Sequence, residues 1–127
     1  MKTLLFIPFL FVYSMVIGQT DNSDSIIGKP IKIGKLEIAQ NDFQKSMTLD
    51  EAKYACEGLG QGWRLPTKNE LNFLFENKDE IGGFANSVYW SSAENNNYYA
   101  WSFDFLFGNA FKNYKNVRCI VRAVRDF

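Results

Sequence analysis

The feature of this sequence that most constrains its fold is a helix-start motif that occurs twice. The motif is a capping box, made by Thr48 with Glu51 and again by Thr67 with Glu70. In such a box the threonine hydroxyl accepts from a free backbone N–H, and the glutamate reaches back to the N–H of the threonine. Apolar residues follow each box at helical spacing. The first stripe is Leu49, Ala52, Ala55, Cys56 and Leu59, and the second is Leu71, Leu74 and Phe75. The sequence therefore predicts two successive amphipathic helices, joined by residues 62–66.

The segments that precede and follow these helices have the pattern of strands. They are residues 31–39, 88–92, 100–107 and 117–124. The clearest is the third, where Ser102 and Asp104 share one face and Trp101, Phe103, Phe105 and Phe107 share the other. A strand, two helices and several further strands predict an α+β domain, with the helices packed against an antiparallel sheet.

The first 18 residues have the layout of a secretory signal peptide. Lys2 gives a positive start, an apolar run extends from Leu4 to Ile17, and small or modest side chains precede a cleavage site after Gly18. The run is shorter than the roughly 18 to 20 apolar residues that cross a bilayer, and Pro8 interrupts it. We therefore expect residues 1–18 to be a signal peptide, residues 19–30 a flexible leader and residues 31–127 one domain. That domain is expected to be exported and not inserted in a membrane.

Charge and residue types exclude several functions. Lys and Arg number 14, as do Asp and Glu, so the chain has no basic excess for binding nucleic acid. The chain has no histidine, which removes Ser-His and Cys-His nucleophile pairs and the usual near-neutral proton shuttle. We therefore expect a protein that is not an enzyme, has no cofactor and does not bind nucleic acid.

The two cysteines, Cys56 and Cys119, favour a disulfide because an even count in an exported chain is typical of one. Closing so long a loop would remove about 4 kcal/mol of unfolded-chain entropy. The alternatives are two buried free thiols or a metal pair. A zinc site fits poorly, since no histidine is present to complete it.

The sequence also resembles a known family. The motifs that carry the resemblance are residues 62–71, 89–92, 100–101, Gly108 and 117–125, together with the first helix and its Cys56. Over about residues 33 to 127 they are similar to the Legionella collagen-like protein (Lcl) C-terminal domain family, formerly a domain of unknown function. The resemblance implies a C-type-lectin-like fold, with two helices packed on a small twisted antiparallel sheet with long loops. It also implies that Cys56 and Cys119 form the disulfide between the first helix and the last strand.

The same resemblance implies a bacterial protein that is secreted, periplasmic or on the cell surface, with a role in adhesion or ligand display. Sugar-binding C-type lectins hold calcium with a Glu-Pro-Asn or Gln-Pro-Asp loop and a Trp-Asn-Asp strand, which this sequence lacks. Glu94 with Asn95, Asn96 and Asn97 leaves a weak calcium site as an alternative to an exposed turn. Formylglycine-generating oxidases share the fold but need a second, short cysteine pair, so a relative of those enzymes is the least favoured interpretation.

Residues 93–116 are rich in tyrosine and asparagine, the types that adaptable binding surfaces prefer. The predicted ligand-binding residues are Asn95, Asn97, Tyr98, Tyr99, Asn109, Phe111, Asn113 and Tyr114. The alternative is that the asparagines form turns and half of the aromatic residues are core. The sequence thus predicts a non-catalytic recognition domain for a glycan or protein ligand. The alternative function is an assembly module of a surface appendage that docks to a sister subunit.

The tryptophans and the basic residues near the end of the chain could act in the fold or in binding. The aromatic residues Trp63, Trp90 and Trp101 are expected in the core, because large aromatic side chains are usually buried. The basic residues near the end of the chain are Lys112, Lys115, Arg118, Arg122 and Arg125. They could form a stripe for an acidic partner. The neutral balance of charge favours pairing with carboxylates on neighbouring strands.

Overall fold

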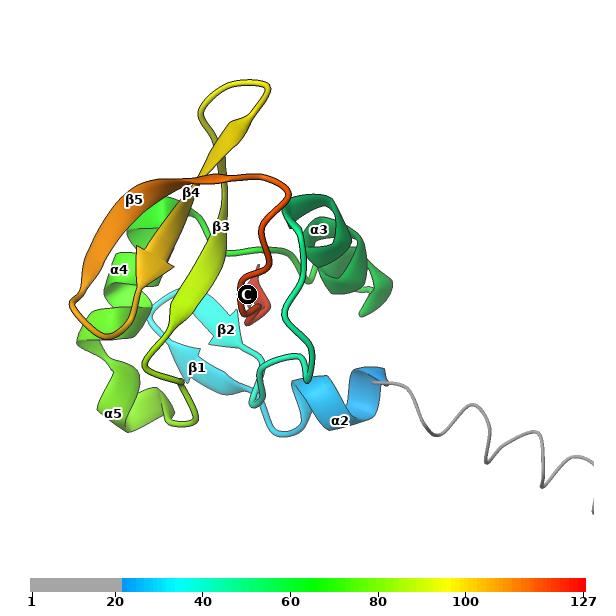
Figure 1. Cartoon of the computed structure of the whole chain (residues 1–127). Coiled ribbons are helices and arrows are strands. Elements are labelled where there is room, and N and C mark those ends of the chain that lie inside the picture. The colour runs from blue at the N-terminus through cyan, green and yellow to red at the C-terminus, as the bar shows by residue number, and fades with distance from the viewer. Residues whose placement is uncertain (1–21) are drawn as a thin grey trace, which may run out of the picture.

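A computed structural model describes residues 22–127 (Figure 1). The helices are α2 (Ser23–Ile27), α3 (Leu49–Gly58), α4 (Lys68–Glu76) and α5 (Lys78–Ile81). The strands are β1 (Ile31–Ile33), β2 (Leu36–Ile38), β3 (Val88–Glu94), β4 (Tyr99–Asp104), β5 (Asn109–Tyr114) and β6 (Val124–Asp126). The α+β class predicted from the sequence is confirmed. No helix within the described residues is long and apolar enough to cross a membrane.

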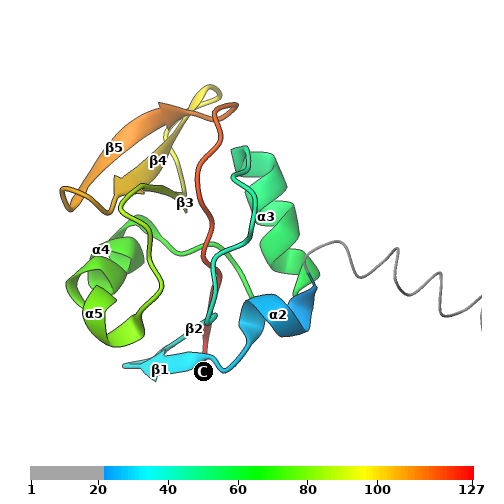
Figure 2. The same cartoon turned by 60° about the horizontal axis from the view of Figure 1, so that its bottom comes forward.

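The strands form two antiparallel sheets, one in the order β1-β2-β6 and the other in the order β3-β4-β5. Figure 2 shows the sheets at opposite ends of the domain, with α4 and α5 on one side and α3 on the other. Residues 117–123 run between the two sheets. They bond to Met47, Val88 and Trp90 through isolated backbone contacts rather than through a regular ladder. The predicted strand 117–124 was therefore wrong in extent, because its apolar alternation reflects burial on both sides and only Val124 enters a sheet.

Both predicted helices form, and both capping boxes are complete. The Thr48 hydroxyl accepts from the Glu51 N–H at 3.4 Å, and the Thr67 hydroxyl accepts from the Glu70 N–H at 3.1 Å. Each glutamate accepts in return from the N–H of its threonine. The buried residues of the two helices are all members of the predicted stripes, so the local sequence signals and the packing agree: Leu49, Ala52 and Cys56 on α3, and Leu71 and Leu74 on α4.

The predicted leader is structured in part. Its residues 19–21, like the predicted signal peptide, lie outside the described residues. From Asn22 onward the chain forms α2, where the Asn22 side chain caps the helix and Ile26 is buried in the core. The domain therefore begins before residue 31.

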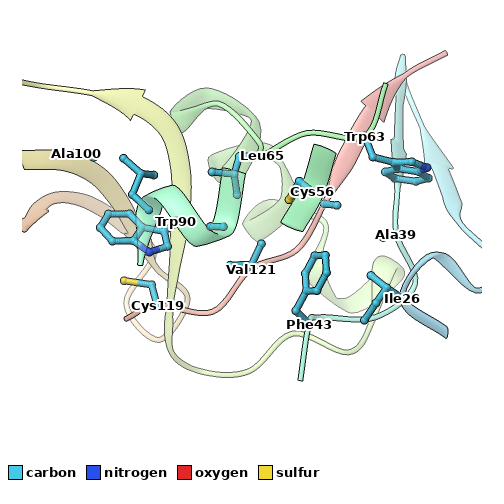
Figure 3. Packing of buried hydrophobic residues seen from close by; sticks show 13 residues of the cluster. Ile26, Ala39, Phe43, Cys56, Trp63, Leu65, Trp90, Ala100, Cys119 and Val121 are labelled. Carbon is cyan, nitrogen blue, oxygen red and sulfur yellow. The ribbon is translucent and has the colours of Figure 1, made fainter. Parts of the chain in front are cut away.

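The core consists of two clusters of buried side chains. The first joins α2 and α3 to the closing segment and includes Trp63, Trp90 and Val121 (Figure 3). The second lies between α4 and the sheets and includes Leu71, Leu74, Tyr89, Phe103 and Phe105. Trp63 and Trp90 are thus core residues as expected, whereas Trp101 is only partly buried.

The predicted disulfide between Cys56 and Cys119 is not formed, and both residues are buried free thiols. Cys119 exchanges backbone hydrogen bonds with Met47, just before the start of α3, at 2.9 Å. Cys56 lies about two turns along that helix, roughly 10 Å further at 1.5 Å per residue. A disulfide joins Cα atoms that are at most about 7 Å apart. In Figure 3 the two side chains lie in different parts of the cluster, and the sulfur of Cys119 points away from Cys56. Burial raises the pKa of the Cys56 thiol to about 12 and that of Cys119 to about 11.

Most of the basic residues near the end of the chain form ion pairs, as the neutral charge balance favoured. Arg122 is fully buried and donates to Asp42 at 2.7 Å. Arg125 donates to Glu37 at 2.7 Å, and the more exposed Arg118 donates to Glu51 at 3.1 Å. These pairs link the closing segment to β2, to the loop after it and to α3. The arginines therefore act in the fold and do not form a free basic stripe.

Candidate functional site

The β3–β4 hairpin projects beyond the body of the domain, as the yellow loop at the top of Figure 1 shows. Its turn is built by Asn96, whose side-chain oxygen accepts from the N–H groups of Tyr98 at 2.8 Å and Tyr99 at 2.9 Å. The Asn95 N–H donates across the turn to the Tyr99 carbonyl at 2.9 Å. One asparagine of the predicted binding loop therefore forms a turn, and its neighbours are displayed by that turn.

Glu94 anchors the base of this hairpin. Its carboxylate accepts from the ammonium groups of Lys53 on α3 and of Lys115 after β5, the latter at 2.6 Å. The hydrogen bonds from Lys115 and Lys53 lower the pKa of Glu94 to about 2. Because two ammonium groups already occupy the carboxylate, it is a poor ligand for calcium. No group of three or more candidate metal-ligating acids or thiols occurs among residues 22–127.

An aromatic pair lies where β4 begins and β5 ends. Tyr99 and Tyr114 are directly opposite in the register, and their ring centroids are 4.7 Å apart. Cross-strand aromatic pairs of this kind stabilise a sheet and hold each other's orientation. The hydrogen bond with Tyr114 raises the pKa of the Tyr99 hydroxyl. Tyr114 remains 54% exposed and the neighbouring Tyr98 is 71% exposed, so these rings combine exposure with a fixed position.

Trp101 continues the same face of the sheet, two residues further along β4. The ammonium group of Lys68, the first residue of α4, lies 3.8 Å from the ring centroid of Trp101, and that of Lys112 lies 5.7 Å away. Lys112 is opposite Trp101 in the register and thus shares its face. We call the surface formed by Tyr99, Trp101, Tyr114 and these two lysines the aromatic face. It presents rigid rings flanked by cations.

The structure brings together five of the eight predicted binding residues. Asn95, Asn97, Tyr98, Tyr99 and Tyr114 lie at the hairpin end of the β3-β4-β5 sheet. Asn109 does not join them, because it pairs with Asp104 at the opposite end of β5, roughly 17 Å away at 3.4 Å per residue. A single binding patch with the predicted membership is therefore not formed.

Phe111 and Asn113 lie on the other face of the sheet from Tyr114. Phe111 is opposite Ser102 and Asn113 is opposite Ala100, while side chains alternate between faces along a strand. Asn113 is partly buried, and its amide donates to the sulfur of Cys119 at 3.6 Å. The sequence predicted no strand over residues 109–114, so the side chains of β5 could not be assigned to one face of the sheet or the other. The spacing of Tyr99 and Trp101, two residues apart on a strand, was the signal that could have indicated the aromatic face, whereas no local pattern indicated Lys68.

A cleft of about 490 Å³ opens between α3, the connector, β3 and the last strand. Its lining residues are Lys53, Glu57, Arg64, Leu65, Thr67, Ser92 and Asp126. Arg64 forms a bidentate pair with Glu70 at 2.8 and 3.0 Å and a further bond to Asp126 at 2.9 Å. Burial acts to raise the pKa of Glu70, but the hydrogen bonds from Arg64 and from the Thr67 backbone outweigh it and lower the pKa. The Arg64 guanidinium and the carboxylates of Glu70 and Asp126 are therefore hydrogen-bonded to one another, which indicates a structural role at the wall of this cleft.

Comparisons with known proteins bear on the family and the fold. Residues 23–125 match the family model described as the Lcl C-terminal domain. Among proteins of curated function, none matches the sequence. The fold is similar to the crystal structure of botrocetin, with a TM-score of 0.59 and 11% sequence identity over 79% of this chain and 98% of that chain. It is also similar to a botrocetin chain in a complex with a mutant von Willebrand factor A1 domain, with a TM-score of 0.57, 12% identity and the same coverage. These likenesses confirm the C-type-lectin-like fold.

Proposed function

The chain belongs to the Lcl C-terminal domain family, and from that premise we propose that it is a non-catalytic recognition domain outside the cell. Its ligand is a glycan or a protein, bound at the aromatic face and the neighbouring hairpin. The observation that carries this proposal is the pairing of the partly exposed Tyr99 with the exposed Tyr114 next to Trp101. Export depends on residues 1–18, which lie outside the described part of the chain.

The aromatic face has the physical properties of a recognition surface. Tyrosine and tryptophan offer large contact areas, and their few rotatable bonds cost little entropy on binding. The contact between the Tyr99 and Tyr114 rings and the register of β4 with β5 fix the rings before a ligand arrives. Preorganisation of this kind raises affinity because the cost of ordering the surface has been met in folding. The tyrosine hydroxyls and the hairpin asparagines add donors and acceptors.

The fold supports a binding role in a second way. One of the similar structures is a complex of botrocetin with a protein domain, so this architecture is compatible with a protein partner. The chemistry of this chain supports the absence of catalysis, since both thiols are buried with raised pKa values and the chain has no histidine. Arg64, which lines the cleft, and Glu94, at the base of the hairpin, are engaged in ion pairs.

The test measures binding of the exported chain to a glycan array and to extracts of the cell envelope. A variant with Tyr98, Tyr99 and Tyr114 replaced by alanine is expected to lose binding at least about tenfold, the loss of a few aromatic contacts. The matched control is Tyr54→Ala, because Tyr54 is even more exposed but lies on α3. Unchanged affinity of the triple variant would refute the proposal. Recovery of a single envelope subunit with no bound glycan would favour the alternative role in assembly.

A further inference from the structure

Strand β5 forms a free edge of the β3-β4-β5 sheet. On its inner side it pairs with β4 along its full length. The opposite edge of the sheet is covered, since the Trp90 and Ser92 N–H groups of β3 donate to Ile120 and Pro66. Figure 2 shows β5 as the outermost strand of the sheet, and the described residues include no segment beside its outer edge. The sheet therefore ends in a strand whose outer edge can accept another strand.

The direction of the backbone groups along β5 follows from hydrogen bonds at both ends. The Lys115 N–H donates to the Tyr98 carbonyl at 2.9 Å, and the Phe111 carbonyl accepts from the Ser102 hydroxyl at 3.2 Å. The odd-numbered residues of β5 thus direct their backbone N–H and C=O groups toward β4. Ala110 and Lys112 direct theirs outward, away from the sheet. No hydrogen bond within residues 22–127 uses these outward groups. The ammonium group of Lys112 lies over Trp101, so this charge does not oppose the pairing of another strand with the edge.

Exposed apolar side chains occur at both ends of this edge. At the end of β5 lies Tyr114, which is 54% exposed. At its beginning lies the β4–β5 turn, which displays Leu106 at 54% and Phe107 at 77% exposure. The turn is rigid, because the Asp104 carboxylate accepts from the Leu106 N–H at 2.7 Å and Phe105 is buried among other aromatic rings. Fixed, neighbouring apolar side chains in water are characteristic of an interface.

We propose that two copies of the chain associate by antiparallel pairing of their β5 strands, which joins the two sheets into one of six strands. Antiparallel pairing of a strand with its own copy places the beginning of each strand beside the end of the other. It therefore brings the Leu106–Phe107 turn of one copy to the Tyr114 end of the other, and the exposed apolar groups at both ends cover each other. The single charged residue of the strand, Lys112, projects onto a face and leaves the edge apolar or neutral.

The outward groups restrict the register of this pairing. Outward-facing residues must pair with outward-facing residues of the copy, so the central registers place Ala110 opposite Lys112 or Lys112 opposite itself. The second of these sets two like charges directly opposite, which is unfavourable. The first forms four backbone hydrogen bonds and places Phe111 opposite Phe111 at the two-fold axis. We therefore assign the register in which Ala110 of one copy pairs with Lys112 of the other.

This arrangement also changes the proposed binding surface. The Gly108 position of one copy falls opposite Tyr114 of the other, so the adjacent Phe107 borders the aromatic face of its partner. Each aromatic face would then be extended by residues of the second copy. The association itself does not depend on the proposed recognition function, because its readout is molecular mass and not ligand binding.

The first test is sedimentation velocity of the exported chain over a range of concentrations. The chain is expected to form a dimer, and Lys112→Pro is expected to weaken the dimer at least about tenfold, since proline removes an outward N–H and blocks the edge. This substitution leaves the hydrogen bonds to β4 intact. The matched control is Lys112→Ala, which removes the charge but keeps the N–H and should still dimerise. Circular dichroism confirms that each variant is folded. A monomer at every concentration, or a dimer unaffected by proline, overturns the proposal.

The second test examines the register by disulfide crosslinking. In the assigned register Phe111 meets its copy as a non-hydrogen-bonded pair with Cα atoms about 4.5 Å apart, so Phe111→Cys should crosslink on oxidation. Ala110→Cys is the control, because its copy lies two residues out of register, beyond the reach of a disulfide. The native thiols do not compete, since both are buried with raised pKa values. Crosslinking at position 110 and not at 111, or at neither, contradicts the assignment.

Discussion

Trp90 and Trp101 lie on neighbouring strands of one sheet, yet their surroundings are opposite. Trp90 is fully buried and its indole N–H donates to the Met47 carbonyl at 2.7 Å. Trp101 is partly exposed, and the ammonium groups of Lys68 and Lys112 lie over its ring. The same contrast holds for charge. Arg122 is fully buried against Asp42, whereas Glu94 and its two lysines lie at the surface.

The contrast separates a scaffold region from a display region. The scaffold region consists of α3, residues 117–126, the β1-β2-β6 sheet and Trp90 of β3, where polar side chains such as Arg122 and Glu37 are buried and paired. The display region is the end of the β3-β4-β5 sheet, residues 94–101 and 112–115, where aromatic and polar side chains are exposed or partly exposed and are held by short-range bonds. The fold is therefore stabilised in the scaffold region, and the display region can vary without loss of the fold. Substitutions in the scaffold should change stability, and substitutions in the display region should change binding.

The largest expected effect is the loss of stability on substitution of Arg122. Arg122→Met removes a guanidinium that donates to Asp42 at 2.7 Å and to the Ala39 carbonyl at 3.2 Å. Because it leaves the Asp42 carboxylate without its charged partner, the free energy of unfolding should fall by about 3–5 kcal/mol. The measurement is urea denaturation. The matched control is Arg118→Met, whose ion pair with Glu51 is more than half exposed and should contribute less than about 1 kcal/mol. Equal losses at the two positions would remove the distinction between buried and surface pairs.

A smaller effect compares the two tryptophans directly. Trp90→Phe loses the hydrogen bond to Met47 and leaves a cavity, so we expect a loss of about 2–3 kcal/mol in the free energy of unfolding. Trp101→Phe should cost less than about 1 kcal/mol, since its ring is partly exposed, but should weaken ligand binding. Denaturation and a binding assay on both variants provide the measurement. If Trp101→Phe destabilised the domain as strongly as Trp90→Phe, the aromatic face would belong to the core.

The scaffold region was predicted better from the sequence than the display region. The capping boxes at Thr48 and Thr67 are local signals, since both partners of each box lie within one turn of helix. The family motifs extended the prediction from two helices to the whole C-type-lectin-like fold. The disulfide could not be tested from sequence, because the separation of Cys56 and Cys119 depends on where residues 117–123 cross the domain.

The display region depends on register, which is a long-range property. Tyr99 meets Tyr114 because β4 and β5 pair in one particular alignment, and a shift by one residue would move Tyr114 to the other face. The asparagines of residues 109–113 indicated a loop, although this segment is strand β5. Phe111 and Asn113 were therefore predicted to lie on the same surface as Tyr114, whereas they lie on the other face of the sheet. Lys68 reaches Trp101 from a separate helix, a contact that only the packing of α4 against the sheet creates.

The smallest expected effect concerns the attachment of the display region through Glu94. Its pKa of about 2 in the folded state lies below its ordinary value of 4.5, so the folded state binds the proton less readily. The stabilisation is fully present above about pH 4.5 and is lost as the pH falls toward 2. Because the group is exposed, the loss should be local, seen as faster hydrogen exchange of the Asn95 and Asn96 amides. Glu94→Gln should lack this acid step, whereas Glu57→Gln should retain it, because Glu57 forms no ion pair within residues 22–127. An acid step that persisted in Glu94→Gln would show that another group fastens the hairpin to α3, and the boundary between the two regions would have to be drawn elsewhere.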